Sequence, residues 1–186
     1  MEVREMLLEA TLGLVSRDGL RFTMDDLASE LKISKKTVYK FFDSKEALLM
    51  AVAEDCFMKI KAKEKEVLED PSLSLLDRIE RLIIAFPSEF QQFNWYAMEE
   101  VAEKYPNVYS YVRNRIENDW EPTLQLLEEG KRTGVLREFD VRIFKAIVEG
   151  SIEHFLTSNS LGINYTEALK EMMNILMAGI KREISL

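Results

Sequence analysis

The sequence predicts an all-α fold of about nine to ten helices, and three observations favour it. Only seven glycines and four prolines occur in 186 residues, too few for the turn-rich loops of an all-β fold. Hydrophobic residues make up 47% of the chain and charged residues 31%, a balance typical of a folded globular protein. Apolar side chains recur at helical spacing, and no segment alternates as a half-buried strand does.

The first predicted helix covers residues 2–17, where apolar side chains share one face and an Asp-Gly pair supplies the stop. Thr23, with an acid three positions later, is typical of a capping box and predicts a short helix over 24–31. Ser34 predicts the N-cap of a second short helix over 35–41. The two short helices are therefore separated by a tight turn of about three residues.

A long helix is expected from Ser44 to about Leu68, where Asp70 and Pro71 end it. The later helix boundaries fall mostly at proline or glycine, which interrupt helices or cap their ends. The sequence predicts further helices over residues 73–85, 88–104, 107–119, 121–133, 140–158 and 165–184.

The two short helices have the lengths and apolar spacing of a helix-turn-helix. Six apolar side chains are spaced to fix the helices at an angle: Leu27, Ala28, Leu31, Ile33, Val38 and Phe41. The other face of the second helix offers cations, a hydroxyl and a phenol, which suit a phosphate-lined DNA groove: Lys35, Lys36, Thr37, Tyr39 and Lys40. The helix N-termini at Thr23, Ser34 and Ser44 are expected to add backbone amides for phosphates.

The charge distribution agrees with a single DNA-contacting surface. The formal net charge of −8 by itself disfavours a nucleic-acid partner. Between Lys32 and Lys45, however, five lysines face one acid, so the helix-turn-helix is the basic part of an acidic chain. A second group of lysines alternates around the end of the long helix and is interpreted as solvent-facing: Lys59, Lys61, Lys63 and Lys65.

Residues 7–49, LLEATLGLVSRDGLRFTMDDLASELKISKKTVYKFFDSKEALL, resemble the TetR (tetracycline-repressor-like) family almost position by position. The landmarks of that pattern fall on Ala10, Gly19, Thr23, Leu27, Ala28, Ile33, Ser34, Thr37, Tyr39, Phe42, Lys45, Glu46 and Leu48. The resemblance implies a DNA-binding domain over residues 1–46 and a ligand-binding and dimerisation domain over 47–186. It also implies phosphate contacts by Thr23, Tyr39 and Lys45, with Lys35, Lys36, Thr37 and Lys40 on or beside the base-reading surface.

Two positions depart from the family pattern. Lys32 stands in the turn where glycine is usual, and Lys36 stands where a glycine often precedes the threonine. If the turn needs a left-handed backbone, a lysine at position 32 costs about 1–2 kcal/mol. The operator sequence can therefore not be transferred from relatives.

Specific DNA binding by so small a unit usually requires two half-sites, so we expect a homodimer on double-stranded operator DNA. The last two helices carry apolar stripes broader than one neighbour needs, and the family typically dimerises there. The expected interface residues are Phe144, Ile147, Ser151, Phe155, Leu169, Met172, Met173, Leu176 and Ile180. About half of each stripe is expected to fill the protomer's own core.

Aromatic residues are dense between positions 86 and 120, and such side chains can line a cavity for a small apolar or aromatic effector. The expected ligand-binding residues are Phe86, Phe90, Phe93, Trp95, Tyr96, Tyr109, Trp120 and His154. The alternative for each of these residues is a place in the core. The resemblance implies a repressor that such a ligand releases from DNA; regulation by a protein partner, or without any effector, stays open.

Several other classes are disfavoured. Cys56 is the only cysteine and His154 the only histidine, so we expect no disulfide, no metal site and no cofactor. The sequence contains no hydrolase, Walker A or zinc-protease motif, and an enzyme is not expected. No apolar run is long enough to span a bilayer and no leader is evident, so a cytoplasmic protein without membrane contact is expected.

Overall fold

The computed structural model describes residues 2–85, 87, 97–158 and 160–182. These residues form ten α-helices and one 3-10 helix, and they contain no strand beyond an isolated bridge between Leu136 and Lys181, which confirms the all-α prediction. The elements are α1 (Val3–Asp18), η1 (Gly19–Arg21), α2 (Met24–Glu30), α3 (Lys35–Phe41), α4 (Lys45–Glu69), α5 (Leu75–Ile83), α6 (Ala97–Lys104), α7 (Pro106–Asn118), α8 (Glu121–Thr133), α9 (Val141–Thr157) and α10 (Tyr165–Ile180).

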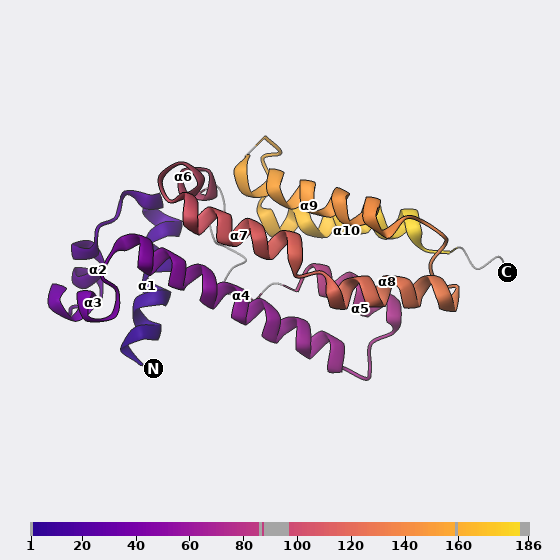
Figure 1. Cartoon of the computed structure of the whole chain (residues 1–186), viewed down its shortest axis with the longest axis horizontal. Coiled ribbons are helices and arrows are strands. Elements are labelled where there is room, and N and C mark those ends of the chain that lie inside the picture. Colours follow the sequence, from indigo (N-terminus) through magenta and orange to yellow (C-terminus); the bar gives the residue numbers. More distant parts are fainter. Residues whose placement is uncertain (1, 86, 88–96, 159, 183–186) are drawn as a thin grey trace.

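The helices form an elongated body with α1, α2 and α3 at one end (Figure 1). From there α4 runs along the body, with α5, α7 and α8 packed against or beyond it, while α9 and α10 lie side by side on the opposite flank. Because α4 begins at the small N-terminal unit and ends far from it, this helix connects the two ends of the molecule. None of the described helices combines the length and apolarity needed to cross a membrane.

The short N-terminal helices begin where side-chain capping predicts. The hydroxyl of Thr23 accepts a hydrogen bond from the amide of Asp26, and that of Ser34 accepts one from the amide of Thr37, each at 3.1 Å. Ser44 caps α4 in the same way. Each cap satisfies a backbone amide that the helix itself leaves unpaired, so these residue types fix where the helices start.

The core of the N-terminal unit corrects one prediction. Leu7, Leu27 and Val38 are fully buried, but Phe41 is 39% exposed and the adjacent Phe42 takes the expected core position at 5%. Phe42 has left the helix and adopts an extended backbone, with φ −138° and ψ 115°, which turns its ring inward. The end of α3, and not helical spacing alone, therefore decides which ring is buried.

The C-terminal helices follow the predicted order: α8 has the predicted bounds, α7 is shifted by one residue, and α5, α9 and α10 are shorter than predicted. Ser74 starts α5 through a capping box with Asp77, so the helix is shorter than the expected 73–85. Of the helix expected over 88–104, the described part is α6, and residues 88–96 lie outside the description. Pro106 and Pro122 fall in first helical turns as predicted, where a missing amide hydrogen costs little.

Candidate DNA-binding surface and inner cavity

The turn between α2 and α3 has a left-handed backbone at Lys32, the case that the sequence left conditional. Lys32 has φ 53° and is the only residue other than glycine with positive φ among those described. The Lys32 amide donates to the Ser29 carbonyl at 3.1 Å, and the Ile33 amide donates to the Ala28 carbonyl at 3.0 Å. This pair of bonds is a Schellman motif, which closes α2 and directs α3 away from it.

The outward face of α3 presents the cations and the phenol together. Lys36 and Lys40 are exposed and have no ion-pair partner in the described part of the chain, while the ring of Tyr39 is 43% exposed. Lys35 differs, because its ammonium lies 2.8 Å from a carboxylate oxygen of Asp25; this hydrogen bond and charge raise the pKa of Lys35. The unpaired positive charge on α3 therefore sits at Lys36 and Lys40.

The hydroxyl groups expected at the DNA surface lie at its edge and are already engaged. Thr23 and Ser34 are exposed, and each oxygen accepts its cap bond. The hydroxyls of Ser34 and Thr37 lie 2.8 Å apart, and Thr37 is half-buried. Each cap engages one first-turn amide, that of Asp26 or Thr37, so phosphate binding through these two amides would compete with the caps.

Lys45 is placed differently from what the resemblance implies. Its ammonium points back into the protein, where it donates to the carbonyl of Leu20 at 2.6 Å and to the carbonyl of Phe22, above whose ring it lies at 4.0 Å. Burial lowers the pKa of Lys45. In this arrangement Lys45 connects the start of α4 to the segment before α2 by hydrogen bonds. These bonds, and not a phosphate contact, are its principal interactions in the structure.

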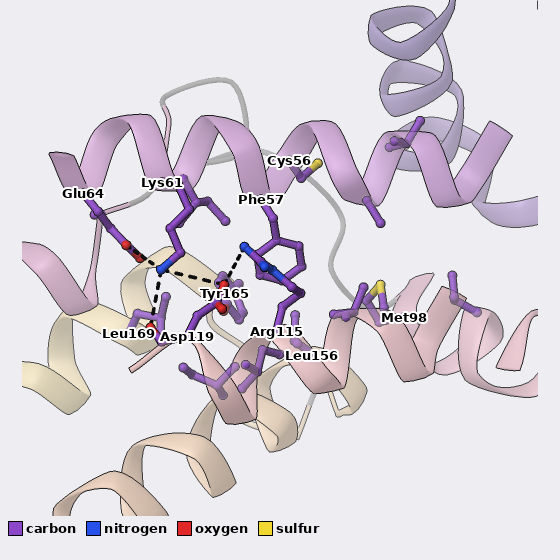
Figure 2. A pocket seen from close by; sticks show the side chains of 18 of the residues that line it. Cys56, Phe57, Lys61, Glu64, Met98, Arg115, Asp119, Leu156, Tyr165 and Leu169 are labelled. Atoms are coloured by element: carbon purple, nitrogen blue, oxygen red, sulfur yellow. Dashed lines mark hydrogen bonds and ion pairs between the residues drawn. The ribbon is translucent and has the colours of Figure 1, made fainter. Parts of the chain in front are cut away.

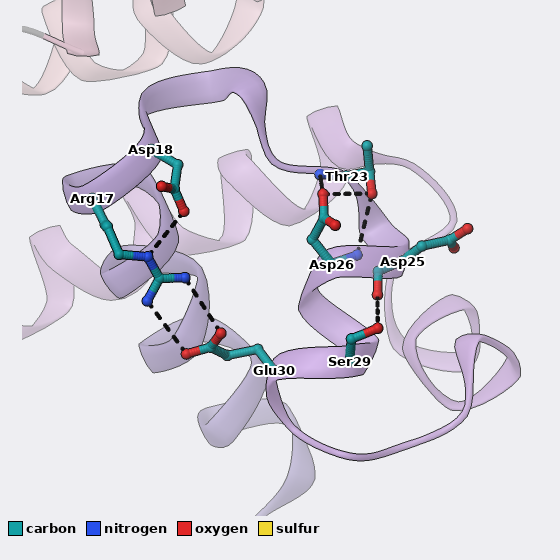
Figure 3. A network of polar contacts seen from close by, with 7 residues as sticks. All are labelled: Arg17, Asp18, Thr23, Asp25, Asp26, Ser29 and Glu30. Carbon is teal, nitrogen blue, oxygen red and sulfur yellow. Dashed lines mark hydrogen bonds and ion pairs between the residues drawn. The ribbon is translucent and has the colours of Figure 1, made fainter.

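A second set of polar contacts fixes α1 against α2 (Figure 3). The guanidinium of Arg17, near the end of α1, lies 3.3 Å from the carboxylate of Glu30 at the end of α2 and 3.0 Å from that of Asp18. Hydrogen bonds from the side chain and backbone of Thr23 lower the pKa of Asp26. These pairs are exposed, so each contributes little to stability, but together they orient the helix-turn-helix.

A cavity of about 190 Å³ lies along the inner face of α4 (Figure 2). Every described helix except α2 and α3 contributes to its lining, and the lining is mostly apolar. Side chains of α4 at helical spacing form one wall: Leu49, Val52, Ala53, Cys56, Phe57, Ile60, Lys61 and Glu64. Leu12, Val15 and Leu20 of the N-terminal unit close one end, beside Met98 and Val101 of α6.

The aromatic residues expected to bind a ligand are placed in three ways. Trp120 is buried and lines the cavity. Tyr109 and His154 do not line it; the Tyr109 hydroxyl lies 3.4 Å from Glu153, and exposed His154 contacts Ser160 at 3.0 Å. The remaining predicted residues lie outside the described part of the chain: Phe86, Phe90, Phe93, Trp95 and Tyr96.

The sequence analysis missed a charged cluster in the cavity lining. Lys61, expected to face solvent, lies 2.7 Å from the carboxylate of Glu64 and 3.7 Å from that of Asp119. The Arg115 guanidinium lies 2.6 Å from the same Asp119 oxygen, Oδ2, and burial raises the pKa of Glu64. The prediction was therefore wrong for Lys61, whereas Lys63 and Lys65 are exposed as expected. The signal available in the sequence was helical spacing, because Lys61 and Glu64 fall on the same face of α4 as the apolar residues Phe57 and Ile60.

Two hydrogen bonds connect the C-terminal helices to the DNA-binding unit. Glu100 of α6 accepts a bond from the amide of Leu20 at 3.1 Å, and Asn107 of α7 donates to Glu46 at 2.8 Å. Gly19, beside Leu20, has φ 62°, and a Cβ at that position would lie 3.4 Å from the Glu100 carboxylate. Helix α6 therefore packs closely against the first residues of η1.

The outer face of α9 and α10 carries exposed isoleucines. Ile143 and Ile147 on α9 are 60% and 46% exposed, and Ile175 on α10 is 65% exposed. A Cβ built at Gly150 or Gly179 would meet no atom within 4 Å, so the helix backbones are open there. Of the residues expected at a dimer interface, Ile147 is exposed and three are half-buried: Ser151, Phe155 and Leu176.

Five residues expected at the interface are instead buried within their own protomer: Phe144, Leu169, Met172, Met173 and Ile180. They lie on the sides of α9 and α10 that face the rest of the molecule. The apolar stripes of the two helices are broad enough to supply both an inner and an outer face, and the sequence alone does not divide them. Ile143 and Ile175 are exposed residues of α9 and α10 that the expected set omitted.

Comparison with known proteins agrees with this geometry. A family model described as "Bacterial regulatory proteins, tetR family" matches residues 7–52, which cover α1, α2, α3 and the first turns of α4. The uncharacterized HTH-type transcriptional regulator YvaF of Bacillus subtilis (strain 168) is 28% identical over 177 residues, covering 94% of this chain and 93% of the relative.

Solved structures share the fold along the whole chain. A transcriptional regulator of the TetR/AcrR family from Thermobifida fusca superposes with a TM-score of 0.70 at 21% identity, covering 96% of this chain and 98% of that one. The regulator FadR from Bacillus subtilis, solved in complex with stearoyl-CoA, gives a TM-score of 0.63 at 16% identity, covering 95% and 98%. The relatives are transcriptional regulators and not enzymes. Residues 7–52 thus match the tetR-family DNA-binding model, and the chain as a whole is similar to bacterial transcriptional regulators.

Proposed function

We propose that the chain acts as a homodimeric repressor that binds operator DNA through α3 and is released by a small ligand in the cavity along α4. The observation that carries this proposal is the composition of the cavity wall. Leu12, Val15 and Leu20 of the DNA-binding unit share one cavity with side chains from α4 to α10. A ligand there contacts both parts of the molecule, which we divide at residues 46 and 47.

For the DNA surface, we propose that Lys36 and Lys40 supply the main phosphate or base contacts, assisted by Tyr39. Their support is exposure without a competing ion pair, since Lys35 is held by Asp25. Lys35 and Thr37 are assigned to the edge of the surface, and Thr23 and Ser34 to phosphates flanking it. We assign Lys45 a structural role beside η1, because its ammonium already donates hydrogen bonds to two backbone carbonyls.

For the dimer, we propose that α9 and α10 of two protomers pack through Ile143, Ile147 and Ile175. Large exposed apolar side chains on neighbouring helices are typical of an interaction surface. Glycines at positions 150 and 179 leave the backbones open to close approach. A two-fold arrangement presents α3 twice, as a DNA site of two half-sites about one helical turn apart requires.

For release, we propose that ligand entry moves α6 and α4 relative to η1, so that the two copies of α3 no longer match successive major grooves. The Glu100 carboxylate bonded to the Leu20 amide is the direct link from the cavity wall to the DNA-binding unit. A coupling of about 1–3 kcal/mol changes the DNA affinity about 5- to 150-fold, which is sufficient for induction. The cavity favours this reading over a regulator without an effector.

The test uses the purified full-length chain and duplexes from the DNA upstream of its own gene. We expect two protomers per site, a protected region with two-fold symmetry, and ligands that raise the melting temperature while lowering the DNA affinity. A chain that binds the duplex equally well with every ligand that stabilises it would contradict ligand-controlled release. It would leave DNA binding itself intact.

A further inference from the structure

The charged end of the cavity indicates the chemistry of its ligand, an inference that rests on the proposed ligand-controlled function. Lys61 and Glu64 extend from α4 toward Arg115 and Asp119 (Figure 2). Arg115 lies in α7, and Asp119 directly follows that helix. The side chains of the four residues keep 17–33% exposure, so solvent reaches this end of the cavity. Two cations and two carboxylates meet here with balanced charge.

The hydrogen bonds at this end leave a donor without an acceptor. Nε of Arg115 is buried and has no hydrogen-bond partner among the described residues. Oδ2 of Asp119 is also buried without a hydrogen bond of good geometry, but the Arg115 guanidinium is its ion-pair partner at 2.6 Å. The unmet group is therefore the donor on Arg115. A buried guanidinium N–H that lacks an acceptor favours a ligand that brings an oxygen.

Neighbouring groups hold Arg115 in place for such an oxygen. Its guanidinium carbon lies 5.5 Å from the centre of the Phe57 ring, and Phe57 itself lines the cavity. Glu64 competes with such a ligand oxygen for the ammonium of Lys61. Burial raises the pKa of Glu64 and so weakens this ion pair. Burial thus disfavours the charged form of Glu64, which reduces its competition with an anionic head group.

The remainder of the cavity sets the body of the ligand. From Phe57 toward Met98 and Leu12 its walls are apolar, with Val52, Cys56 and Val101 among them. The volume of about 190 Å³ is below the range of about 300–1,000 Å³ usual for drug-sized ligands. Because the lining extends along α4 from Leu49 to Glu64, we infer that a short unbranched chain suits the cavity better than a fused ring system does.

We propose that the cavity binds a small single-chain carboxylate, with its head group at Arg115 and Lys61 and its apolar chain directed along α4 toward the DNA-binding unit. The head group completes the hydrogen bonding of Arg115. The chain occupies the part of the cavity that Leu12 and Val15 close, so its far end lies where α1, α4 and α6 meet.

Isothermal titration of the full-length protein with ligands that differ only in the head group tests this assignment. Octanoate, octan-1-ol and octyltrimethylammonium share one chain, and acetate keeps the carboxylate without it. We expect octanoate to bind at least about tenfold more tightly than each of the other three, because hydrogen bonds to charged groups are stronger than neutral ones. Equal or tighter binding of the alcohol or the ammonium overturns the carboxylate assignment, and equal binding of acetate overturns the chain.

Matched variants place the head group. Arg115→Gln is expected to remove the preference for octanoate over octan-1-ol, whereas Arg113→Gln, an exposed arginine of the same helix paired with Glu117, is expected to keep it. Glu64→Gln is expected to tighten octanoate binding, since it removes a competing carboxylate. Preference retained in Arg115→Gln, with operator binding intact, refutes the site. If the wild-type chain does not bind operator DNA at all, the proposed function on which this inference rests is refuted instead.

Discussion

Lysine has opposite surroundings in the two functional regions of this molecule. On α3, Lys36 and Lys40 are exposed and without a described carboxylate partner, so their charges act on whatever approaches from solvent. In the cavity, Lys61 is held by Glu64 and Asp119. The first region is suited to a polyanion that displaces counterions, and the second to one small ligand that enters a pre-arranged set of charges.

Burial and pairing, and not residue type, separate the proposed DNA surface from the proposed ligand site. Lys45 lies between these cases, because it belongs to the basic segment in sequence but donates to backbone carbonyls in the structure. The two regions are joined by α4, which begins at Lys45 and carries Lys61 about four turns later. Substitutions that act on one region alone test whether the distinction is real.

The largest effect is expected from the double substitution Ile147→Asp with Ile175→Asp. Two buried unpaired carboxylates per protomer are incompatible with the proposed α9–α10 interface, so the chain becomes monomeric and operator affinity falls at least about a thousandfold. Sedimentation and DNA titration measure the two consequences. Met58→Asp, at an equally exposed methionine of α4, is the control that should leave both unchanged. A dimeric double variant would move the interface elsewhere.

The next effect concerns the salt dependence of DNA binding. Each of Lys36→Ala and Lys40→Ala removes two cations from a dimer, so the slope of log affinity against log salt should fall by about two per substitution. Lys63→Ala and Lys65→Ala remove the same charge from exposed positions on α4 and should leave the slope unchanged. Equal slopes for both pairs of variants would show that the lysines of α3 contribute no more to DNA binding than exposed lysines of α4 do.

A smaller effect is expected on stability from Lys45→Ala. The carbonyls of Leu20 and Phe22 lose their donor, which should lower the free energy of unfolding by about 1–2 kcal/mol. Chemical denaturation measures this change, and Lys40→Ala is the control, because its exposed ammonium supports no described contact. If Lys45→Ala reduced the salt slope as Lys36→Ala does and left stability unchanged, Lys45 would belong to the DNA surface after all.

The smallest effect is expected in the turn of the helix-turn-helix. Lys32→Gly relieves the left-handed backbone at φ 53° and should raise the free energy of unfolding by about 0.5–1 kcal/mol, the relief being partly offset by the greater freedom of glycine when unfolded. Lys36→Gly, inside α3, should change stability in the opposite direction by a similar amount. A destabilised Lys32→Gly variant would show that the lysine side chain contributes contacts that outweigh its strain.

Sequence reasoning reached most of the helix-turn-helix because its determinants are local. Thr23, Ser34 and Ser44 cap the helices that they were expected to cap, and the turn between α2 and α3 falls where it was expected. One prediction there was wrong, since Phe42 is buried in place of Phe41, and the inward direction of the Lys45 ammonium was not predicted. Both depend on how the chain leaves one helix or enters the next, which spacing along a helix does not specify.

The cavity could not be predicted in the same way, because its wall is assembled from segments far apart in the sequence. Arg115 and Lys61 are separated by more than fifty positions, and nothing local to either indicates that both approach Asp119. Aromatic density favoured residues 86–120, but of the described ones Trp120 lines the cavity and Tyr109 does not. The apolar faces of α9 and α10 were recognised, while their division into inner and outer sides required the fold.

The most direct test of the account is the affinity for an operator duplex, measured with the cavity empty and with it saturated by a ligand whose binding calorimetry has established. The account predicts that saturation weakens DNA binding about 5- to 150-fold and that DNA weakens ligand binding by the same factor. An operator affinity that does not change when the cavity is filled would contradict it.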